Sequence, residues 1–356
     1  MSMLYSVNFH YGANYGAYLE AFALCRKFNM SVIDFFPGFE YFVQPRGKKI
    51  LPFFWRFIAI IRGMKYRLNF PFRVKRFPEF NKFAKTKHFT SCGKIHSIDF
   101  SFASAFIAGS DQIWNPGFIS QQEQIYFLGF GPDNAKRISY AASLGMKQWP
   151  KDFEQKVLPM LRRFDAISVR EESAVSYLTS LGLKNVVCVC DPTILHKGDF
   201  YRKEFPYNRI EDEFSFVYRI REEIPDSVQS LLLPQNREIW LSKPWRWRLP
   251  SVTRWLQNID NAKFVVTDSF HCAVFCILFH KPFLVIPNRS TGKGMNERFA
   301  TLLGKTELEY RALTCEESSE EALRKLNSPI DWEKVDAILE DWRTYSANWL
   351  KKALGE

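Results

Sequence analysis

Short, almost uniformly apolar runs alternate along the chain with longer stretches whose apolar residues recur every three or four positions. The short runs are typical of buried parallel strands, and the longer spacing is typical of helices that pack one face on a sheet. Repeated alternation of this kind favours an α/β fold with mainly parallel strands. In the first half, the pattern predicts strands at residues 3–9, 31–35, 105–108, 137–141, 166–169 and 186–190, and helices at 18–28, 153–164 and 172–181.

The alternation stops at residues 196–213, which are polar and contain a proline, and we predict a domain linker there. A chain of 356 residues fits two domains of roughly 150–200 residues each. We therefore predict two Rossmann-like domains that face a cleft, at 1–195 and 214–330, and a C-terminal helix within 331–356. That amphipathic helix, at 331–350, could pack in either domain or cross back between them. Beyond the linker the pattern predicts strands at 214–220, 237–241, 263–267 and 282–286, and helices at 251–258 and 272–280.

The positive charge of the chain is concentrated in one segment. The formal net charge of the whole chain is +11. Residues 46–96 contain fourteen Lys or Arg and one acid, Glu79, and fourteen minus one gives +13 for this segment alone. The remainder is near neutral, which argues against a nucleic-acid-binding protein because such a protein needs a broader basic surface or a recognised module.

The same segment is rich in aromatic residues, as ILPFFWRFIAIIRGMKYRLNFPFRVKRF shows. Its longest apolar run, 50–61, is interrupted by Arg56 and is far shorter than the roughly 20 residues of a membrane span. Two interpretations remain open. The segment is an interfacial element on anionic lipid, where each basic residue contributes about 1 kcal/mol, or a solvated helical insert whose Phe residues pack on the domain.

The seven cysteines form no CxxC pair and no Cys/His pattern typical of zinc. Cys188 and Cys190 alternate with valines, as residues of a buried strand do. We therefore expect reduced core thiols, no metal and a cytoplasmic protein. The N-terminal residues, MSMLYSVNFHYGANYG, lack the basic start and apolar run of a signal peptide.

Polar residues collect just after the predicted strands, which is where open parallel sheets bind ligands. HYGANYGA lies between the first strand and the first helix, and IAGSDQIWN follows the strand at 105–108. Glycines allow close backbone approach and a helix start favours anions, whereas no GxGxxG or Walker motif specifies a nucleotide. Alternatively, the first stretch is an ordinary tight turn and Asp111 caps a helix. The candidate ligand-binding residues are Asn14, Tyr15, Gly16, Ser110, Gln112, Trp114 and Asn115, and Asp111 is a candidate base or sugar ligand.

Cationic candidates follow three other predicted strands. VREESA places Arg170 at a strand end, where it could bind an anion or pair with one of the adjacent glutamates. TDSFHC and STGKGMNERF follow consecutive strands of the second half, and their polar residues could converge on one anionic ligand. A single histidine at a helix start could equally be structural. The second-half candidates are Ser269, His271, Lys293 and Arg298.

Four stretches in this order resemble one family. NYGAYLEAFAL, GSDQIWN with ISYAASLG, SVREESAVSYL with DPTIL, and TDSFHCAVFCILFHKPF with NERFATLL are similar to the polysaccharide pyruvyl transferase family over about residues 8–312. The basic insert and the tail helix lie outside the resemblance. The resemblance implies a GT-B-like fold and transfer of the pyruvyl group of phosphoenolpyruvate to two hydroxyls of a sugar, as a cyclic ketal. It places the donor near the second domain and the sugar against the first.

The resemblance also implies an acceptor and a location. The acceptor would be a lipid-linked saccharide or a cell-envelope glycan precursor at the inner face of the cytoplasmic membrane, where the basic insert could hold the protein peripherally. Phosphoenolpyruvate is then a co-substrate, and no cofactor is expected.

The reaction requires an acid and a base near neutral pH and fixed cations for two anionic groups. We assign His271 as the principal acid/base, Asp111 as a secondary acid/base or sugar ligand, and Arg298 with Lys293 as anion binders. Many family members have Arg-x-His where this chain has Ser269-Phe270-His271. Another cation must therefore replace the missing arginine, and the candidates are Lys293, Arg298, Arg219 and Arg221.

Two other functions compete with pyruvyl transfer. A nucleotide-sugar glycosyltransferase of GT-B type would share the architecture, but we find no convincing E-x7-E-like pattern for the ribose and base in the second half. A non-catalytic lipid- or glycan-binding protein would use the basic insert, and the missing arginine beside His271 favours this alternative.

Overall fold

The computed structural model describes residues 3–10, 14–35, 92–119, 121–241, 250–288, 296–314 and 316–356. The basic insert predicted at 46–96 lies outside these residues except for 92–96, and Lys293 also lies outside them.

The first sheet has six parallel strands in the order β2-β1-β3-β4-β5-β6. The order reverses between β1 and β3, so the carboxyl ends of these two strands form the switch point at which α/β sheets bind ligands. The strands are β1 (Met3–Val7), β2 (Ser31–Val32), β3 (Ala103–Ala108), β4 (Lys136–Ala142), β5 (Ala166–Val169) and β6 (Val187–Cys188). The helices of this part are α1 (Tyr15–Phe28), α5 (Pro116–Ile119), α6 (Glu123–Tyr126), α7 (Lys151–Leu161) and α8 (Glu172–Ser180), with 3-10 turns η1 (Cys92–Ser97) and η2 (Pro192–Leu195).

The second sheet has four parallel strands in the order β10-β9-β7-β8. Helices pack around it, so this half has the same alternation of strand and helix as the first. The strands are β7 (Ser215–Arg219), β8 (Asn236–Trp240), β9 (Phe264–Thr267) and β10 (Phe283–Val285). The helices are α9 (Gly198–Glu204), α10 (Asp226–Gln229), α11 (Val252–Asn261), α12 (Phe270–Leu278), α13 (Glu297–Thr306), α14 (Ser319–Asn327) and α15 (Trp332–Leu354), with η3 (Glu309–Arg311).

The ten predicted strands are all present, and their ends differ from the prediction by at most three residues. The segment predicted as a linker, 196–213, contains helix α9. Arg202 of α9 forms an ion pair with Asp260 of α11 at 2.8 Å, so this part of the segment packs on the second sheet's helices. The four-residue helices α5, α6 and α10 were not predicted because a single turn has too few residues to show a period.

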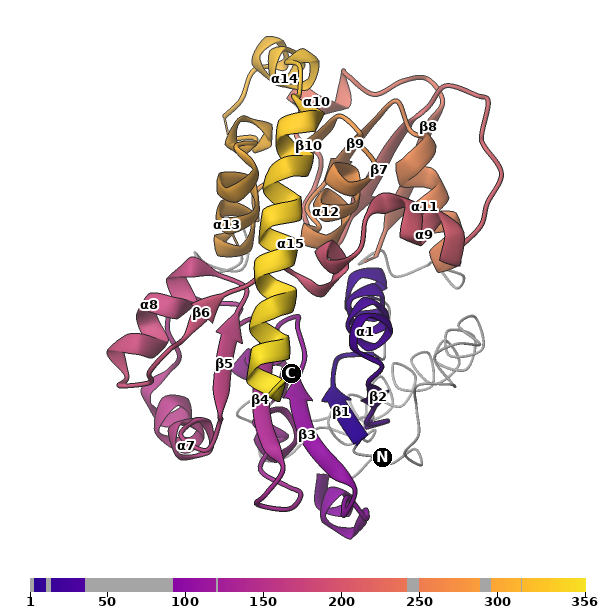
Figure 1. The fold of residues 1–356 in the computed structure, drawn as a ribbon. Helices are drawn as coiled ribbons and strands as arrows, with labels where there is room; N and C mark the ends of the chain where they lie inside the picture. The colour runs from indigo at the N-terminus through magenta and orange to yellow at the C-terminus, as the bar shows by residue number, and fades with distance from the viewer. Residues whose placement is uncertain are drawn as a thin grey trace, which may run out of the picture.

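Helix α15 crosses back from the second half of the molecule to the first (Figure 1). Near its start, Asp336 pairs with His280 at the end of α12 at 3.0 Å. Near its end, the Ser346 hydroxyl accepts a hydrogen bond from the Cys190 backbone N–H (2.9 Å), and Lys136 of β4 donates to the Ala353 carbonyl (2.9 Å). Of the alternatives left open by the sequence, the structure selects the crossing. Among the described residues, no helix has both the length and the apolarity required to span a bilayer.

One hydrophobic core extends across both halves. Leu19 and Phe22 of α1 share this cluster with Trp255 of α11, Phe275 of α12 and Leu350 of α15. Burial of large apolar side chains between elements of both halves stabilises their relative placement, because each fully buried side chain contributes about 1.5–3 kcal/mol. The halves are therefore held together by core packing as well as by the chain connections.

Helices α1 and α12 approach closely because α1 has a glycine at its second position. A Cβ atom added to Gly16 would lie 1.9 Å from Nδ1 and 2.2 Å from Cγ of His271. No side chain fits in that space, so Gly16 allows the His271 ring to pack directly on the backbone of α1. The sequence identified Gly16 as a ligand-binding candidate, and in the structure its neighbour is a side chain of the second half.

Replacement of Leu350 by alanine should lower the free energy of unfolding by about 2–5 kcal/mol, because this fully buried leucine belongs to the shared core. Chemical denaturation followed by circular dichroism measures the loss. Asn348→Ala, an exposed position on the same helix, is the matched control and should change stability by less than about 0.5 kcal/mol. Equal stability of the two variants would contradict a core role for α15.

Replacement of Gly16 by alanine should destabilise the protein by about 1–3 kcal/mol, because the new methyl group overlaps the His271 ring. Thermal and denaturant melting measure this effect. Gly304→Ala in α13 is the control. The nearest atom to its added Cβ is 3.7 Å away, so alanine there should be neutral or stabilising by up to about 1 kcal/mol. A Gly16→Ala protein as stable as the Gly304→Ala protein would show that the two helices are not in close contact.

Candidate active site

Four helices begin around one buried cluster of charged side chains. His271 is the second residue of α12, Arg298 is the second residue of α13, and Glu171 is the N-cap of α8. Asn14, the N-cap of α1, donates a hydrogen bond to Asp111 of the same cluster at 3.2 Å. Helix N-termini carry partial positive charge and unpaired N–H groups, so this arrangement favours an anionic ligand.

His271 lies between two carboxylates. Its Nε2 is 3.3 Å from Glu20 Oε2 and 3.4 Å from Asp191 Oδ2, and the side chain is almost completely buried. Burial alone would lower the pKa of His271, but Asp191 and Glu20 outweigh it and raise the pKa to about 9. The imidazole is therefore protonated at neutral pH and can act as an acid.

Glu20 is a fully buried acid on a helix whose residues from Tyr15 to Cys25 are all buried. Burial raises its pKa to about 8, although the hydrogen bond from His271 opposes the rise. Its Oε1 has no hydrogen-bond partner among the described residues. Glu20 is thus protonated at neutral pH, and it can pass a proton to His271 once His271 has given up its own. The sequence analysis did not identify Glu20, and the signal it offered was a single acid within an apolar helix.

Arg170 is the cation at the centre of the cluster. Its Nη1 is 2.8 Å from Asp191 Oδ2 and 3.6 Å from Glu20 Oε2, and its Nη2 is 3.6 Å from Asp111 Oδ1. The carboxylate of the adjacent Glu171 is 3.9 Å from Arg170 Nε. The pairing of Arg170 with a neighbouring glutamate, which the sequence suggested, is therefore one of its four contacts with acidic side chains. Burial would lower the pKa of Arg170, but the surrounding carboxylates raise it above its ordinary value. Nε and Nη2 make no hydrogen bond within the described residues, so these N–H groups can donate to a ligand.

Asp191 lies at the end of β6 and balances two cations. Burial would raise its pKa, but His271 and Arg170 hold it well below the ordinary value. Its second oxygen accepts hydrogen bonds from the Thr193 backbone N–H (3.0 Å) and hydroxyl (2.6 Å). These bonds fix the carboxylate while His271 and Arg170 approach the other oxygen. Asp191 follows a predicted strand in DPTIL, but the sequence analysis assigned it no role.

Asp111 and Arg298 meet at the other side of Arg170. Arg298 Nη1 is 3.9 Å from Asp111 Oδ1, the oxygen that Arg170 also approaches. Burial and the nearby Arg170 lower the pKa of Arg298 to about 10, so both arginines remain charged at neutral pH. The two guanidinium groups lie 4.6 and 5.6 Å from the ring centre of Phe270. The structure therefore brings Asp111, Arg170, His271 and Arg298 into one site.

Several other candidates from the sequence stabilise the local fold around this site. Asn14 accepts hydrogen bonds from the backbone N–H groups of Gly16 and Ala17, in addition to its contact with Asp111. Ser269 caps α12 by accepting from the Cys272 N–H at 3.4 Å. The Ser110 hydroxyl donates to the Ala141 carbonyl at 2.9 Å.

Trp114 and Tyr15 were predicted to bind a substrate, and the structure places both rings in packed cores. Trp114 is fully buried, stacks on Phe127 at 5.3 Å and donates its indole N–H to the Tyr126 carbonyl. Tyr15 stacks on Trp255 at 5.2 Å. Neither ring offers a free face to a sugar. An aromatic residue next to polar residues can point inward, and a substrate-binding role for Trp114 and Tyr15 stays a prediction.

Gln112 and Asn115 bond to each other rather than lying open. The Asn115 amide donates to Gln112 Oε1 at 2.7 Å, and Asn115 Oδ1 accepts from the Gly117 N–H at the start of α5. A Cβ atom added to Gly145 would lie 2.2 Å from Gln112 Oε1, so a neighbouring loop covers this pair. Asp111 is not a helix cap, because Asn115 caps α5.

Arg219, one of the cations considered as a replacement for the missing arginine, is engaged elsewhere. Its Nε donates to Glu238 at 2.7 Å, and its guanidinium lies 3.9 Å from the ring centre of Trp240. Asp268, which precedes Ser269, accepts hydrogen bonds from three consecutive backbone N–H groups, at Ile220, Arg221 and Glu222. This carboxylate ties the end of β9 to the end of β7 and thereby positions the start of α12.

Glu20, Asp191 and His271 place one ligand atom each within 4.8 Å of one another, a spacing that a metal ion could use. Two observations favour protons over a metal. Arg170 already lies 2.8 Å from the Asp191 oxygen that faces His271, and a metal would have to displace the proton of an imidazole whose pKa is about 9. The absence of a metal requirement stays a prediction from the sequence.

Comparisons with known proteins identify the fold and the family. In solved structures, the chain is similar to UDP-N-acetylglucosamine 2-epimerase from Rickettsia bellii, with 10% identity, 99% of this chain and 98% of that chain covered, and a TM-score of 0.52. It is also similar to S. aureus MnaA in its structure with UDP, with 12% identity, 100% and 97% covered, and a TM-score of 0.51. These similarities show the predicted GT-B-like arrangement of two Rossmann-like domains.

The search of curated proteins gave no match. The family model described as polysaccharide pyruvyl transferase matches residues 25–290, which include Asp111, Arg170, Asp191 and His271. Since this match covers most of the sequence, the chain belongs to the polysaccharide pyruvyl transferase family.

Proposed function

We propose that the protein transfers the pyruvyl group of phosphoenolpyruvate to two hydroxyls of a sugar, forming a cyclic ketal and releasing phosphate. The observation that carries this proposal is a buried pair of arginines, Arg170 and Arg298, beside a protonated His271. Phosphoenolpyruvate has a carboxylate and a phosphate, which require two fixed cations, and an enol methylene, which requires an acid.

Arg170 is the cation that we assign in place of the arginine missing beside His271. Ser269 caps α12 and carries no charge. The Arg170 guanidinium, however, lies over the ring of Phe270, which is the residue between Ser269 and His271 in the sequence. Arg170 belongs to the first domain, so the donor would be held by cations from both domains. Lys293, the other anion binder proposed from the sequence, lies outside the described residues, and its role stays a prediction.

The reaction follows from the states of these groups. His271 gives its proton to the methylene carbon, which becomes the methyl group, while the adjacent carbon gains cationic character. One sugar hydroxyl adds to that carbon and loses its proton to Asp111. The bond from carbon to the phosphate oxygen then breaks, the second hydroxyl adds, and its proton leaves on the phosphate. Asp111 then releases the first proton to solvent, and the His271–Glu20 pair takes up one proton, so the enzyme ends as it began.

Glu20 and Asp191 support this cycle by keeping His271 charged. Asp191 stays ionised and stabilises the imidazolium, and Glu20 is a protonated neighbour that can resupply the proton. Both are positioning residues because they act on the substrate through His271.

The acceptor that we propose is a lipid-linked saccharide or another cell-envelope glycan precursor, as the family implies. Binding to an anionic membrane surface through residues 46–96 and a cytoplasmic location at the inner face of the membrane are also proposals. They rest on the sequence alone, because most of that segment lies outside the described residues.

The wild-type protein should release phosphate from phosphoenolpyruvate in the presence of a suitable saccharide and add a pyruvyl group to it. A panel of lipid-linked saccharides, followed by phosphate release and mass spectrometry, tests this activity. Replacement of His271 by alanine should lower the rate at least about 100-fold because the acid is lost. His280→Ala, a surface histidine paired with Asp336, is the matched control and should retain full activity. Sugar transfer from nucleotide sugars, or glycan binding without turnover of any donor, would replace this proposal with one of its competitors.

Replacement of Glu20 by glutamine should move the alkaline limb of the pH–rate profile to lower pH. His271 acts as an acid, so activity is present below its pKa of about 9 and is lost as the pH rises through it. Glu20 becomes an anion above its own pKa of about 8 and then helps to retain the His271 proton, which glutamine cannot do. The profile of kcat/KM measures the shift. Glu204→Gln, which alters a surface pair with Arg26, should leave the profile unchanged. An unshifted limb in Glu20→Gln would exclude the coupling.

A further inference from the structure

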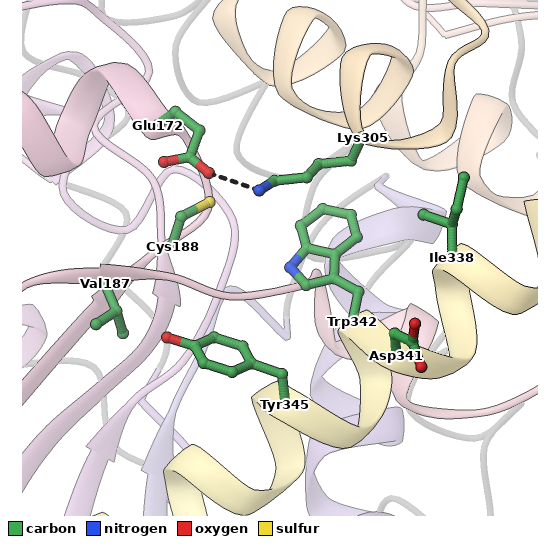
Figure 2. A pocket seen from close by; sticks show the side chains of 8 residues that line it. All are labelled: Glu172, Val187, Cys188, Lys305, Ile338, Asp341, Trp342 and Tyr345. Carbon is green, nitrogen blue, oxygen red and sulfur yellow. Dashed lines mark ion pairs between the residues drawn. The ribbon is translucent and has the colours of Figure 1, made fainter.

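A pocket of about 590 Å³ lies apart from the charged cluster, where α8, β6, α13 and α15 meet (Figure 2). These four elements come from three parts of the fold, since α8 and β6 belong to the first half, α13 belongs to the second half, and α15 crosses between them. The volume is within the range of about 300–1,000 Å³ that small-molecule sites occupy. None of its lining residues belongs to the charged cluster described above.

Two aromatic side chains from one face of α15 form a wall of this pocket. Trp342 and Tyr345 are three residues apart, so they lie on the same side of the helix and point toward the end of β6 (Figure 2). Trp342 is largely buried, but Tyr345 is 49% exposed, which is unusual among the large hydrophobic residues that the structure describes. Tyr345 therefore offers an aromatic surface that is open to solvent at the pocket.

The remaining lining combines hydrogen-bonding groups of both signs. Glu172 at the start of α8 pairs with Lys305 of α13 at 3.0 Å, and about half of each side chain is exposed. Asp341 adds a further carboxylate next to Trp342. The charges sum to about −1, because the lysine is already balanced by Glu172.

We propose that this pocket is an accessory binding site for a neutral pyranose oligosaccharide. An aromatic face stacks on the C–H face of a sugar ring, carboxylates accept hydrogen bonds from hydroxyls, and the ammonium group donates to them. An anionic ligand is disfavoured by the two carboxylates, and a lipid chain is disfavoured by three charged groups in the lining. The proposal rests on the proposed function in one respect, namely that the acceptor is a saccharide chain longer than the pyruvylated sugar.

The pocket lies beside segments that carry the active-site arginines. The thiol of Cys188, in the pocket lining, donates a hydrogen bond to the Arg170 carbonyl at 3.4 Å. The Glu172 N–H donates to Thr301 of α13 at 3.2 Å, and the same helix carries Arg298 at its other end. A glycan seated in the pocket thus contacts the segments that position both arginines of the active site. Its expected effect is to hold a long acceptor near the enzyme.

The full-length protein should bind neutral hexasaccharides without any donor present. The probes are hexasaccharides of glucose, galactose, mannose and N-acetylglucosamine, with binding measured by calorimetry and by saturation-transfer NMR. Tyr345→Ala should weaken binding about tenfold, whereas Tyr345→Phe, which keeps the ring, should not. Phe102→Ala removes the most exposed aromatic elsewhere on the described surface and should leave binding unchanged. Because Tyr345 is half exposed, its replacement should not prevent folding, and circular dichroism verifies this.

Binding that survives in His271→Ala but weakens in Tyr345→Ala supports the accessory site, since it separates the pocket from the active site. Equal binding by wild type and Tyr345→Ala, or no binding of any hexasaccharide, overturns it. Where pyruvyl transfer is observed, Tyr345→Ala should raise KM for a long acceptor with kcat unchanged and should not affect a monosaccharide acceptor. If no pyruvyl transfer occurs, the proposed function fails, but the donor-free binding measurements still decide on this site.

Discussion

The buried guanidinium of Arg170 is the interaction on which the arrangement of the site depends. A charge taken out of water costs several kcal/mol unless opposite charges surround it. The acidic side chains around Arg170 come from four separate segments: Glu20 of α1, Asp111 after β3, Glu171 before α8 and Asp191 after β6. Each segment must reach the same edge of the first sheet for the charge to be stable. The strand order, with its reversal between β1 and β3, brings them there.

The second domain completes this cluster and does not form a separate site. His271 reaches across the junction to Glu20 and Asp191, and Gly16 leaves the space that its ring occupies. The shared core and the crossing helix α15 hold the two halves in contact. The position of His271 in the site therefore depends on side chains that pack far from the imidazole. The raised pKa of His271 is therefore a property of the assembled molecule, because both carboxylates that retain its proton lie in the first domain.

The sequence predicted most of the fold because buried parallel strands are short and apolar, and such runs are easily distinguished from amphipathic helices. It also identified Asp111, Arg170, His271 and Arg298, since polar residues after strands are few. Glu20 was missed because its partner His271 is 251 residues away and helical periodicity gives no sign of a contact at that separation. The burial of Trp114 was not predicted either, since sequence cannot tell which side of a loop faces the core. The contacts that decide a role are long-range, and the local pattern does not contain them.

Ser269 stands where many family members have an arginine, and the structure shows how this difference is accommodated. Serine accepts the Cys272 N–H and so gives α12 a capped start, which an arginine side chain cannot do. The lost positive charge is available from Arg170, whose guanidinium lies over the next residue, Phe270. The cation beside the histidine then belongs to the opposite domain. The donor that we propose would contact both halves of the molecule at once through Arg170 and His271, so its binding and the packing of the two domains would stabilise each other.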